Sequence, residues 1–159
     1  MEAEPVRTTL KVRRVARLRI SLKRSAAIEV DRISIGRLKL AYVACADRKL
    51  RYTKGRSRIA YIGTTKTGFQ RVAQSAANRA DDIPGLRGVN KLHVRIVTCT
   101  SRQHVKTWHK LERALIIAFR ERFGEIPKCN SQGKRFVWTE AEDKLFRKRR
   151  LLNVIDDLS

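Results

Sequence analysis

Hydrophobic and polar residues alternate along the first part of the chain, in the pattern of half-buried β-strands. From Leu10 to Leu22 the apolar residues fall mostly at even positions, often with Arg or Lys between them. A second alternating segment runs from Ile33 to Ala44, and a short apolar segment runs from Ile59 to Ile62. Each of these segments is predicted to be a strand, and the first has a basic side that faces solvent or phosphate.

Two of the predicted strands carry tyrosines, Tyr42 and Tyr61. Residues 45–58 lie between them and are basic and turn-prone around Lys54-Gly55. We therefore expect residues 45–58 to form a connection, and the two tyrosine strands to pair as a long hairpin.

Helical and strand patterns follow each other in the rest of the chain. Residues from Gly68 to Asn78 place apolar side chains at helical spacing, and residues from Lys91 to Cys99 alternate as in a core strand. A long helix is predicted from Arg102 to Phe123. Five apolar residues form its buried stripe: Trp108, Leu111, Leu115, Ala118 and Phe119.

An irregular segment is predicted over residues 124–134, which contain Pro127 and Gly133. A final helix is expected to begin at Thr139, because Thr139-Glu140-Ala141-Glu142 matches a capping box. We predict that this helix continues through the basic run from Arg147 to Arg150.

The charge of the chain points to nucleic acid as its partner. Lys and Arg number 37 against 15 Asp and Glu, which gives a formal net charge of +22 on 159 residues. Residues 1–60 alone hold 17 Lys and Arg against 5 Asp and Glu. No run approaches the roughly 18 apolar residues that span a bilayer, so a membrane role is not expected.

The cysteines and the N-terminus indicate a cytoplasmic protein, nucleoid-associated if the chain is bacterial. Cys45, Cys99 and Cys129 are odd in number and show neither CxxC nor zinc spacing, so we expect reduced thiols. No apolar signal core follows the first residues, Met1 to Pro5.

Glu112 is the sharpest candidate for chemistry, because it shares a helix face with apolar residues. A carboxylate on such a face is costly unless a cation or hydrogen-bond donors compensate it. One interpretation is a boundary carboxylate paired with a nearby Arg, and the other is a metal ligand. Arg71 lies near the start of a predicted helix, where a guanidinium can grip a phosphate, although a solvated surface charge has the same signature.

Tyr42 and Tyr61 suit two roles. In most strands a tyrosine packs its ring and exposes its hydroxyl. A phenol with the ordinary pKa of about 10 is a poor base at neutral pH, but neighbouring cations or a metal lower the pKa. Four cations are candidates for that effect: Lys54, Arg56, Arg58 and Lys66.

In this ordered set of residues the chain resembles the GIY-YIG nuclease superfamily, which includes homing endonucleases, the nicking subunit of bacterial nucleotide-excision repair and several restriction enzymes. The resemblance covers roughly residues 40–134. Leu40-Ala41-Tyr42 stands for the first motif, and Tyr61-Ile62-Gly63 matches the second literally. The remaining matches are Thr64 to Arg71, Leu111-Glu112 with Ile116 and Phe119, and Pro127 to Asn130 before Gly133.

The chain departs from the family pattern in three places. The first motif keeps only its tyrosine, and the connection to the second motif is longer than usual. Ser75 stands where many members have a histidine, one turn after Arg71. The general base is therefore left open between Tyr42, a metal-bound water and a group not identified in the sequence.

The resemblance implies an α+β fold, with a small, mainly antiparallel sheet flanked by helices. Residues 39–136 would form this core, with a basic β-rich extension at 1–38 and a C-terminal helix at 137–159, all in one compact domain. It also implies one Mg²⁺ or Mn²⁺ ion held by Glu112. Tyr42 would deprotonate or orient the attacking water, Tyr61 would position the phosphate or a water, and Arg71 would stabilise the phosphorane. Asn130 would brace the site.

Double-stranded DNA is the expected substrate, with RNA as the alternative partner. The predicted hydrolase would be a restriction-type, nicking or homing-type endonuclease. The competing hypothesis is a catalytically silent DNA- or RNA-binding module, for example a ribosome-associated one. The cations expected to contact nucleic acid are Arg13, Arg17, Arg19, Lys49, Arg51, Lys54, Arg56, Arg58, Lys66 and Lys134.

Overall fold

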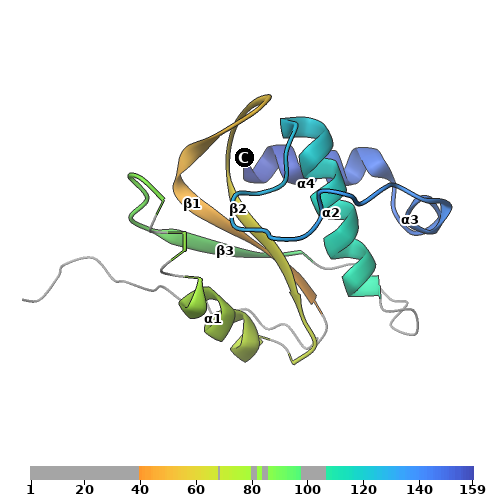
Figure 1. The fold of residues 1–159 in the computed structure, drawn as a ribbon. Coiled ribbons are helices and arrows are strands. Elements are labelled where there is room, and N and C mark those ends of the chain that lie inside the picture. The colour runs from red at the N-terminus through yellow and green to blue at the C-terminus, as the bar shows by residue number, and fades with distance from the viewer. Residues whose placement is uncertain (1–39, 68, 80–81, 84–85, 98–106) are drawn as a thin grey trace, which may run out of the picture.

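The computed structural model describes residues 40–67, 69–79, 82–83, 86–97 and 107–159. Its strands are β1 (Leu40–Tyr52), β2 (Gly55–Thr65) and β3 (Leu92–Val97). Its helices are α1 (Phe69–Asn78), α2 (Thr107–Phe123), α3 (Glu140–Leu145) and α4 (Lys148–Leu158). The strands form an antiparallel sheet in the order β2-β1-β3, so the predicted α+β class with a small antiparallel sheet is confirmed (Figure 1).

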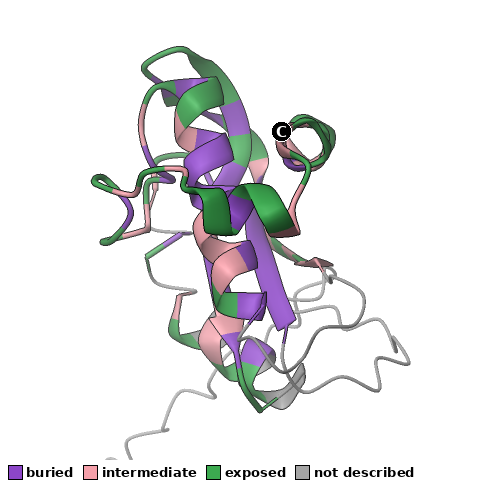
Figure 2. Ribbon diagram, turned by 90° about the vertical axis from the view of Figure 1, so that its right-hand side faces the viewer, coloured by how far each residue is buried: buried purple, intermediate pink, exposed green. Residues whose placement is uncertain are grey.

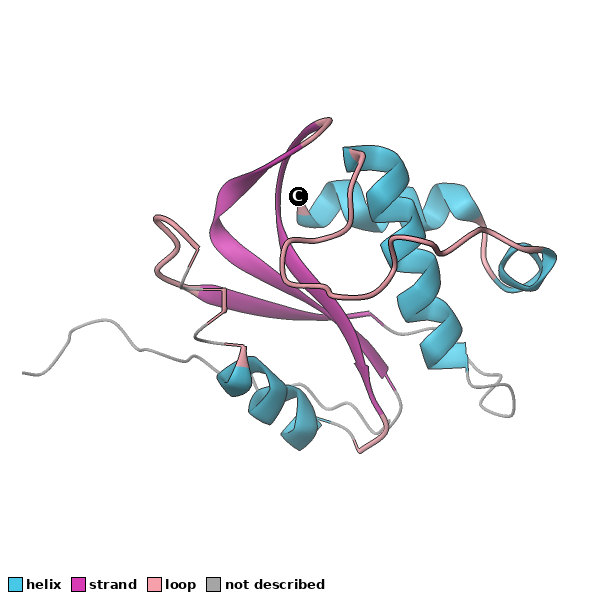
Figure 3. Ribbon diagram, viewed as in Figure 1, coloured by secondary structure: helices cyan, strands magenta, loops and turns pink. Residues whose placement is uncertain are grey.

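Helices cover the sheet from two sides. Helix α1 lies on one side, while α2 and α4 lie together on the other (Figure 3). Each face of the sheet has its own hydrophobic cluster. The α1 face holds Leu40, Tyr42 and Val72, and the opposite face holds a larger cluster that includes Phe119 and Ile155. Figure 2 shows the buried stripe of α2 against the buried strands.

All five residues predicted for the apolar stripe of the long helix are buried in α2, as expected for a core helix. The described part of that helix begins at Thr107, and residues 102–106 lie outside the described residues. The same holds for the strand predicted from Leu10 to Leu22 and for the first part of the strand predicted from Ile33. No helix in the described ranges has the length and apolarity that crossing a membrane requires.

The connection predicted over residues 45–58 is wrong, because most of it is strand. The hairpin runs on to Tyr52, which pairs with Gly55, and only Thr53 and Lys54 form the turn. Residues 40–46 are all buried because helices cover both faces of the sheet, and the pairing register shifts at Cys45 and again before Leu50. Alternation of buried and exposed residues begins only at Leu50, so the hydrophobic pattern does not show that the strand continues past Ala44.

The prediction of a single C-terminal helix is also wrong, because the segment forms α3 and α4 with a break at Phe146 and Arg147. Both residues have extended backbone conformations. The predicted capping box is present, with the Glu142 carboxylate accepting a hydrogen bond from the Thr139 N–H at 2.9 Å. Glu142 also pairs with Arg113 of α2 at 2.8 Å, whereas α4 buries apolar side chains in the core. The break lets each helix make its own contact with the rest of the fold.

Candidate functional site

The two tyrosines lie together over a glycine. Their ring centroids are 5.9 Å apart, and Tyr42 pairs across the sheet with Gly63. A Cβ atom on Gly63 would lie 2.6 Å from the Tyr61 ring and 2.9 Å from the Tyr42 hydroxyl. The glycine of the Tyr61-Ile62-Gly63 motif thus provides the space in which the two phenols converge.

The replacement Gly63→Ala is expected to lower the free energy of unfolding by about 1–3 kcal/mol, because the added methyl group overpacks the tyrosine pair. Urea denaturation measures the loss. The penalty should shrink in a Tyr61→Ala background, where the nearest atom is gone. An equal penalty in both backgrounds would show that the tyrosine does not occupy this position.

Tyr42 is held beneath the α1 helix. Its side chain is buried, and its hydroxyl is within hydrogen-bonding reach of Ser75 on α1 and of Tyr61. Burial raises the pKa of Tyr42 to about 12, while the hydrogen bond to Ser75 and the charge of Arg79 act in the opposite direction. At neutral pH only about one phenol in 100,000 with such a pKa is ionised. The raised pKa of Tyr42 disfavours this phenol as a general base at neutral pH.

Glu112 reaches the same motif from the other side of the sheet. Its Oε2 atom accepts a hydrogen bond from the Thr64 hydroxyl at 3.2 Å, and Thr64 directly follows Gly63. The side chain is 25% exposed, and its ion-pair neighbour is the His109 Nδ1 at 3.8 Å. Burial raises the pKa of the Glu112 carboxyl, and the contacts with Thr64 and His109 lower it.

The alternative of a structural pair between Glu112 and an arginine finds no support in the described residues. The adjacent Arg113 pairs instead with Glu142, and no ion pair joins Glu112 to a Lys or Arg in the part of the chain described. A half-buried carboxylate whose described neighbours are the Thr64 hydroxyl and the His109 imidazole suits a cation from solution.

The donor set fits a hard divalent cation that keeps most of its water. No cluster of three or more His, Cys, Asp or Glu side chains suited to a metal occurs among the described residues. Glu112, with His109 as its neighbour, would supply one or two ligands. Mg²⁺ is commonly bound in this way, through one or two carboxylates with waters and substrate phosphate completing its octahedral shell.

Asn130 fixes the backbone of the second motif. Its side-chain carbonyl accepts a hydrogen bond from the Ile62 N–H at 2.9 Å, and its amide donates to the Ile62 carbonyl at 2.9 Å. Ile62 lies between Tyr61 and Gly63, so this pair of bonds holds the strand edge where the phenols meet.

Arg71 lies in the first turns of α1 with an exposed side chain, and its guanidinium donates to Gln74 at 3.0 Å. It does not contact the tyrosines or Glu112 in this structure. It is one helical turn before Ser75, on the same stripe of the helix. The structure thus places Tyr42 and Tyr61 on the α1 side of the motif, Glu112 on the α2 side through Thr64, and Asn130 on the Ile62 backbone, with Arg71 at the margin.

Two residues of the site were missed in the sequence. The Arg79 guanidinium lies 4.6 Å from the Tyr61 ring centroid and is paired with Asp82 at 3.0 Å. His109 is the neighbour of Glu112. The sequence contains only a weak indication of these two residues. Arg79 follows Ser75 by four residues and His109 precedes Glu112 by three, so each pair shares a helix face.

The cations expected to contact nucleic acid lie in different parts of the chain. The hairpin carries exposed Lys49, Arg51, Lys54, Arg56 and Arg58, and Arg51 lies directly across from Arg56. Lys66 and Lys134 are also exposed but lie elsewhere, after β2 and in the segment between α2 and α3. Arg13, Arg17 and Arg19 lie outside the described residues.

Comparisons with models of protein families, with characterised proteins and with solved structures give no match to this chain.

Proposed function

We propose that this chain is a divalent-metal-dependent endonuclease that hydrolyses DNA phosphodiester bonds, with the fold and site of the GIY-YIG superfamily. The observation that carries the proposal is the convergence of Tyr42 and Tyr61 over Gly63, one residue before the Thr64 that bonds to Glu112. Phenols, a carboxylate and nearby guanidinium groups are a set of side chains suited to phosphodiester chemistry.

Glu112 would hold one Mg²⁺ or Mn²⁺ ion, which when bound supplies positive charge for the leaving 3′ oxygen. The half-buried position of Glu112 strengthens its interaction with any cation, because the surroundings are less polar than water. Thr64 orients the carboxylate through its hydroxyl. The remaining steps fall to the side chains around the motif.

Tyr61 would position the scissile phosphate, because it is the more exposed phenol of the pair and its ring is covered by Arg79. The Tyr42 hydroxyl would donate a hydrogen bond to the attacking water or to the Tyr61 hydroxyl and so orient it. The raised pKa of Tyr42 favours this orienting role over that of general base. His109 lies beside Glu112, with its Nδ1 atom 3.8 Å from the carboxylate, and is placed to accept the proton of the attacking water.

Arg71 would reach the phosphate only when substrate is present. Its contact with Gln74 is exposed and can be exchanged for a phosphate oxygen at little cost. A guanidinium at this point can bind two phosphate oxygens and stabilise the charge that develops in the transition state.

The test is incubation of the purified chain with supercoiled plasmid and Mg²⁺, against the same reaction with a chelator. Metal-dependent nicking or linearisation supports the endonuclease. A mobility shift of DNA or RNA without cleavage would identify instead a binding module, which the exposed cations of the hairpin also suit.

The hairpin is expected to set the salt dependence of DNA binding. Replacing Arg51 and Arg56 together by Gln should reduce the slope of log K against log salt by about 2, because two phosphate contacts are lost. The same affinity loss is expected for unrelated DNA sequences. Fluorescence anisotropy over a series of salt concentrations gives the slope.

The matched control is the pair Arg149→Gln and Arg150→Gln, which removes the same charge from exposed residues of α4. An equal change in slope for both pairs would mean that net charge alone governs binding. Loss of affinity for one sequence only would make the hairpin a reader of bases.

A further inference from the structure

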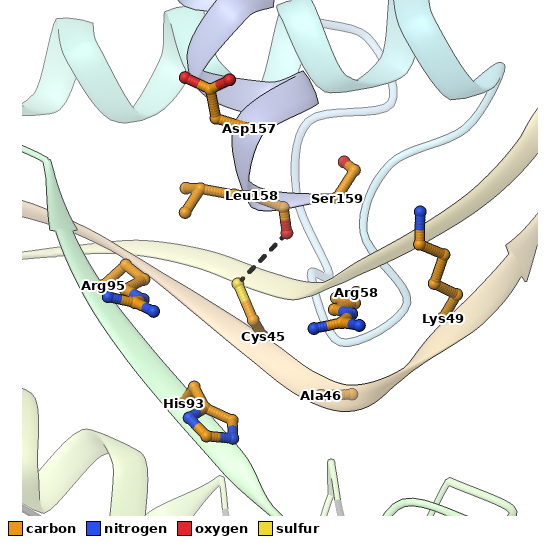
Figure 4. A pocket seen from close by; sticks show the side chains of 9 residues that line it. All are labelled: Cys45, Ala46, Lys49, Arg58, His93, Arg95, Asp157, Leu158 and Ser159. Atoms are coloured by element: carbon orange, nitrogen blue, oxygen red, sulfur yellow. Dashed lines mark hydrogen bonds between the residues drawn. The ribbon is translucent and has the colours of Figure 1, made fainter.

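A cavity of about 360 Å³ lies apart from the tyrosine pair, between the hairpin, β3 and the last turn of α4. It opens where the strands part, because β3 pairs with β1 only as far as Ala46 and the hairpin continues alone. Its size falls in the range of small-molecule sites. Figure 4 shows side chains from all three strands around it.

The cavity gathers positive charge. Lys49 and Arg58 line it from the hairpin, and His93 and Arg95 line it from β3, against a single acidic side chain, Asp157. Register explains the grouping, since His93 pairs with Cys45 and Arg95 with Val43, which points both side chains to the same face. Figure 4 shows the guanidinium groups of Arg58 and Arg95 on either side of Cys45, with the Asp157 carboxylate pointing away from them.

These cations have no carboxylate partner among the described residues. The ion pairs of the described chain use other basic residues, such as Arg113 with Glu142 and Arg122 with Asp156. The Lys and Arg side chains that line the cavity outnumber its one acidic side chain, Asp157, and an anion bound between them would reduce their mutual repulsion.

The C-terminal carbonyl groups of α4 do not bind the cationic side chains of the cavity. A helix C-terminus carries partial negative charge, which could serve as the counter-charge. Its carbonyls, however, have other donors: the Leu158 oxygen accepts from the Cys45 thiol at 3.8 Å, and the Ser159 oxygen accepts from the Arg58 backbone N–H at 3.4 Å. The guanidinium groups of Arg58 and Arg95 have no ion-pair partner among the described residues and can bind a ligand.

We infer that this cavity is a binding site for a phosphate group, either free phosphate or the phosphate at the end of a nucleic-acid strand, held by Arg58, Arg95 and Lys49. Two guanidinium groups can each offer two parallel N–H donors to phosphate oxygens. Chloride and water lack the paired oxygens that such donors match. Three cations that line one cavity match the double charge of a terminal phosphate better than the single charge of a phosphodiester. The inference does not depend on cleavage.

The test is a titration of the full chain with inorganic phosphate at constant ionic strength, without metal or DNA, followed by the backbone amide signals in NMR. Saturable shifts at Cys45, Arg58 and Arg95 are expected. The dissociation constant should rise about tenfold or more in Arg58→Gln with Arg95→Gln, since two charge-assisted contacts are lost.

The control pair Arg149→Gln and Arg150→Gln removes equal charge at the other end of α4 and should leave the affinity unchanged. The single variant Arg95→Gln, at an exposed strand position, should also weaken binding. Absence of saturable shifts, equal weakening in the control, or unchanged affinity in Arg95→Gln would each overturn the site.

A short oligonucleotide with and without a 5′-phosphate distinguishes the two ligand sources. Tighter binding of the phosphorylated form, lost in Arg58→Gln with Arg95→Gln, identifies strand ends as the ligand. Equal binding of the two forms, beside saturable binding of inorganic phosphate, identifies free phosphate.

Discussion

Replacing Glu112 by Gln is expected to abolish plasmid cleavage while the affinity for the same DNA stays within about twofold. The amide keeps the volume of the carboxyl group and can still accept the hydrogen bond of the Thr64 hydroxyl. It loses the negative charge that a divalent cation requires. Cleavage is followed by the conversion of supercoiled plasmid, and Mn²⁺ affinity is measured by electron paramagnetic resonance on the protein without DNA.

Glu121→Gln is the matched control, because Glu121 is an exposed carboxylate on the same helix that pairs with Lys148. It should leave both cleavage and Mn²⁺ affinity unchanged. A Glu112→Gln protein that cuts at the wild-type rate would remove Glu112 from the reaction. Lost cleavage with unchanged Mn²⁺ affinity would place the metal elsewhere.

The elements with a single regular period were predictable from the sequence. The apolar stripe of α2 and the alternation of β3 both follow from side chains that face one core, and both are present. The hydrophobic pattern did not predict the lengths of β1 and of the C-terminal helix correctly. The first seven residues of β1 are all buried and the register shifts at Cys45, so alternation does not reveal the full length of the strand. The capped turn at Thr139 starts a helix that ends after only six residues.

The sequence specifies the relative position of site residues most directly where they lie within one motif. Tyr61, Gly63 and Thr64 are neighbours in sequence, so their joint position follows from one strand. The contact of Arg79 with Tyr61 depends on how α1 packs on the sheet, which no local pattern specifies. The high pKa of Tyr42 likewise arises from burial beneath α1 and could not be foreseen from residue types.

This burial makes Tyr42→Phe a sharp test of the mechanism. The ring would keep its packing against Leu40 and Val72, so the fold should persist. Only the hydroxyl that meets Ser75 and Tyr61 is removed. The cleavage rate at saturating DNA is expected to fall about 100- to 1,000-fold, as for the loss of one preorganised donor in a transition state.

Tyr52→Phe is the matched control for this loss, because it removes another buried phenol hydroxyl that bonds to the Ile59 carbonyl at 2.5 Å, away from the tyrosine pair. It should lower the free energy of unfolding by about 1 kcal/mol without changing the cleavage rate. Single-turnover cleavage and urea denaturation of both variants separate stability from catalysis. A Tyr42→Phe protein with undiminished turnover would remove Tyr42 from the reaction and leave Tyr61 as the phenol that acts on the substrate.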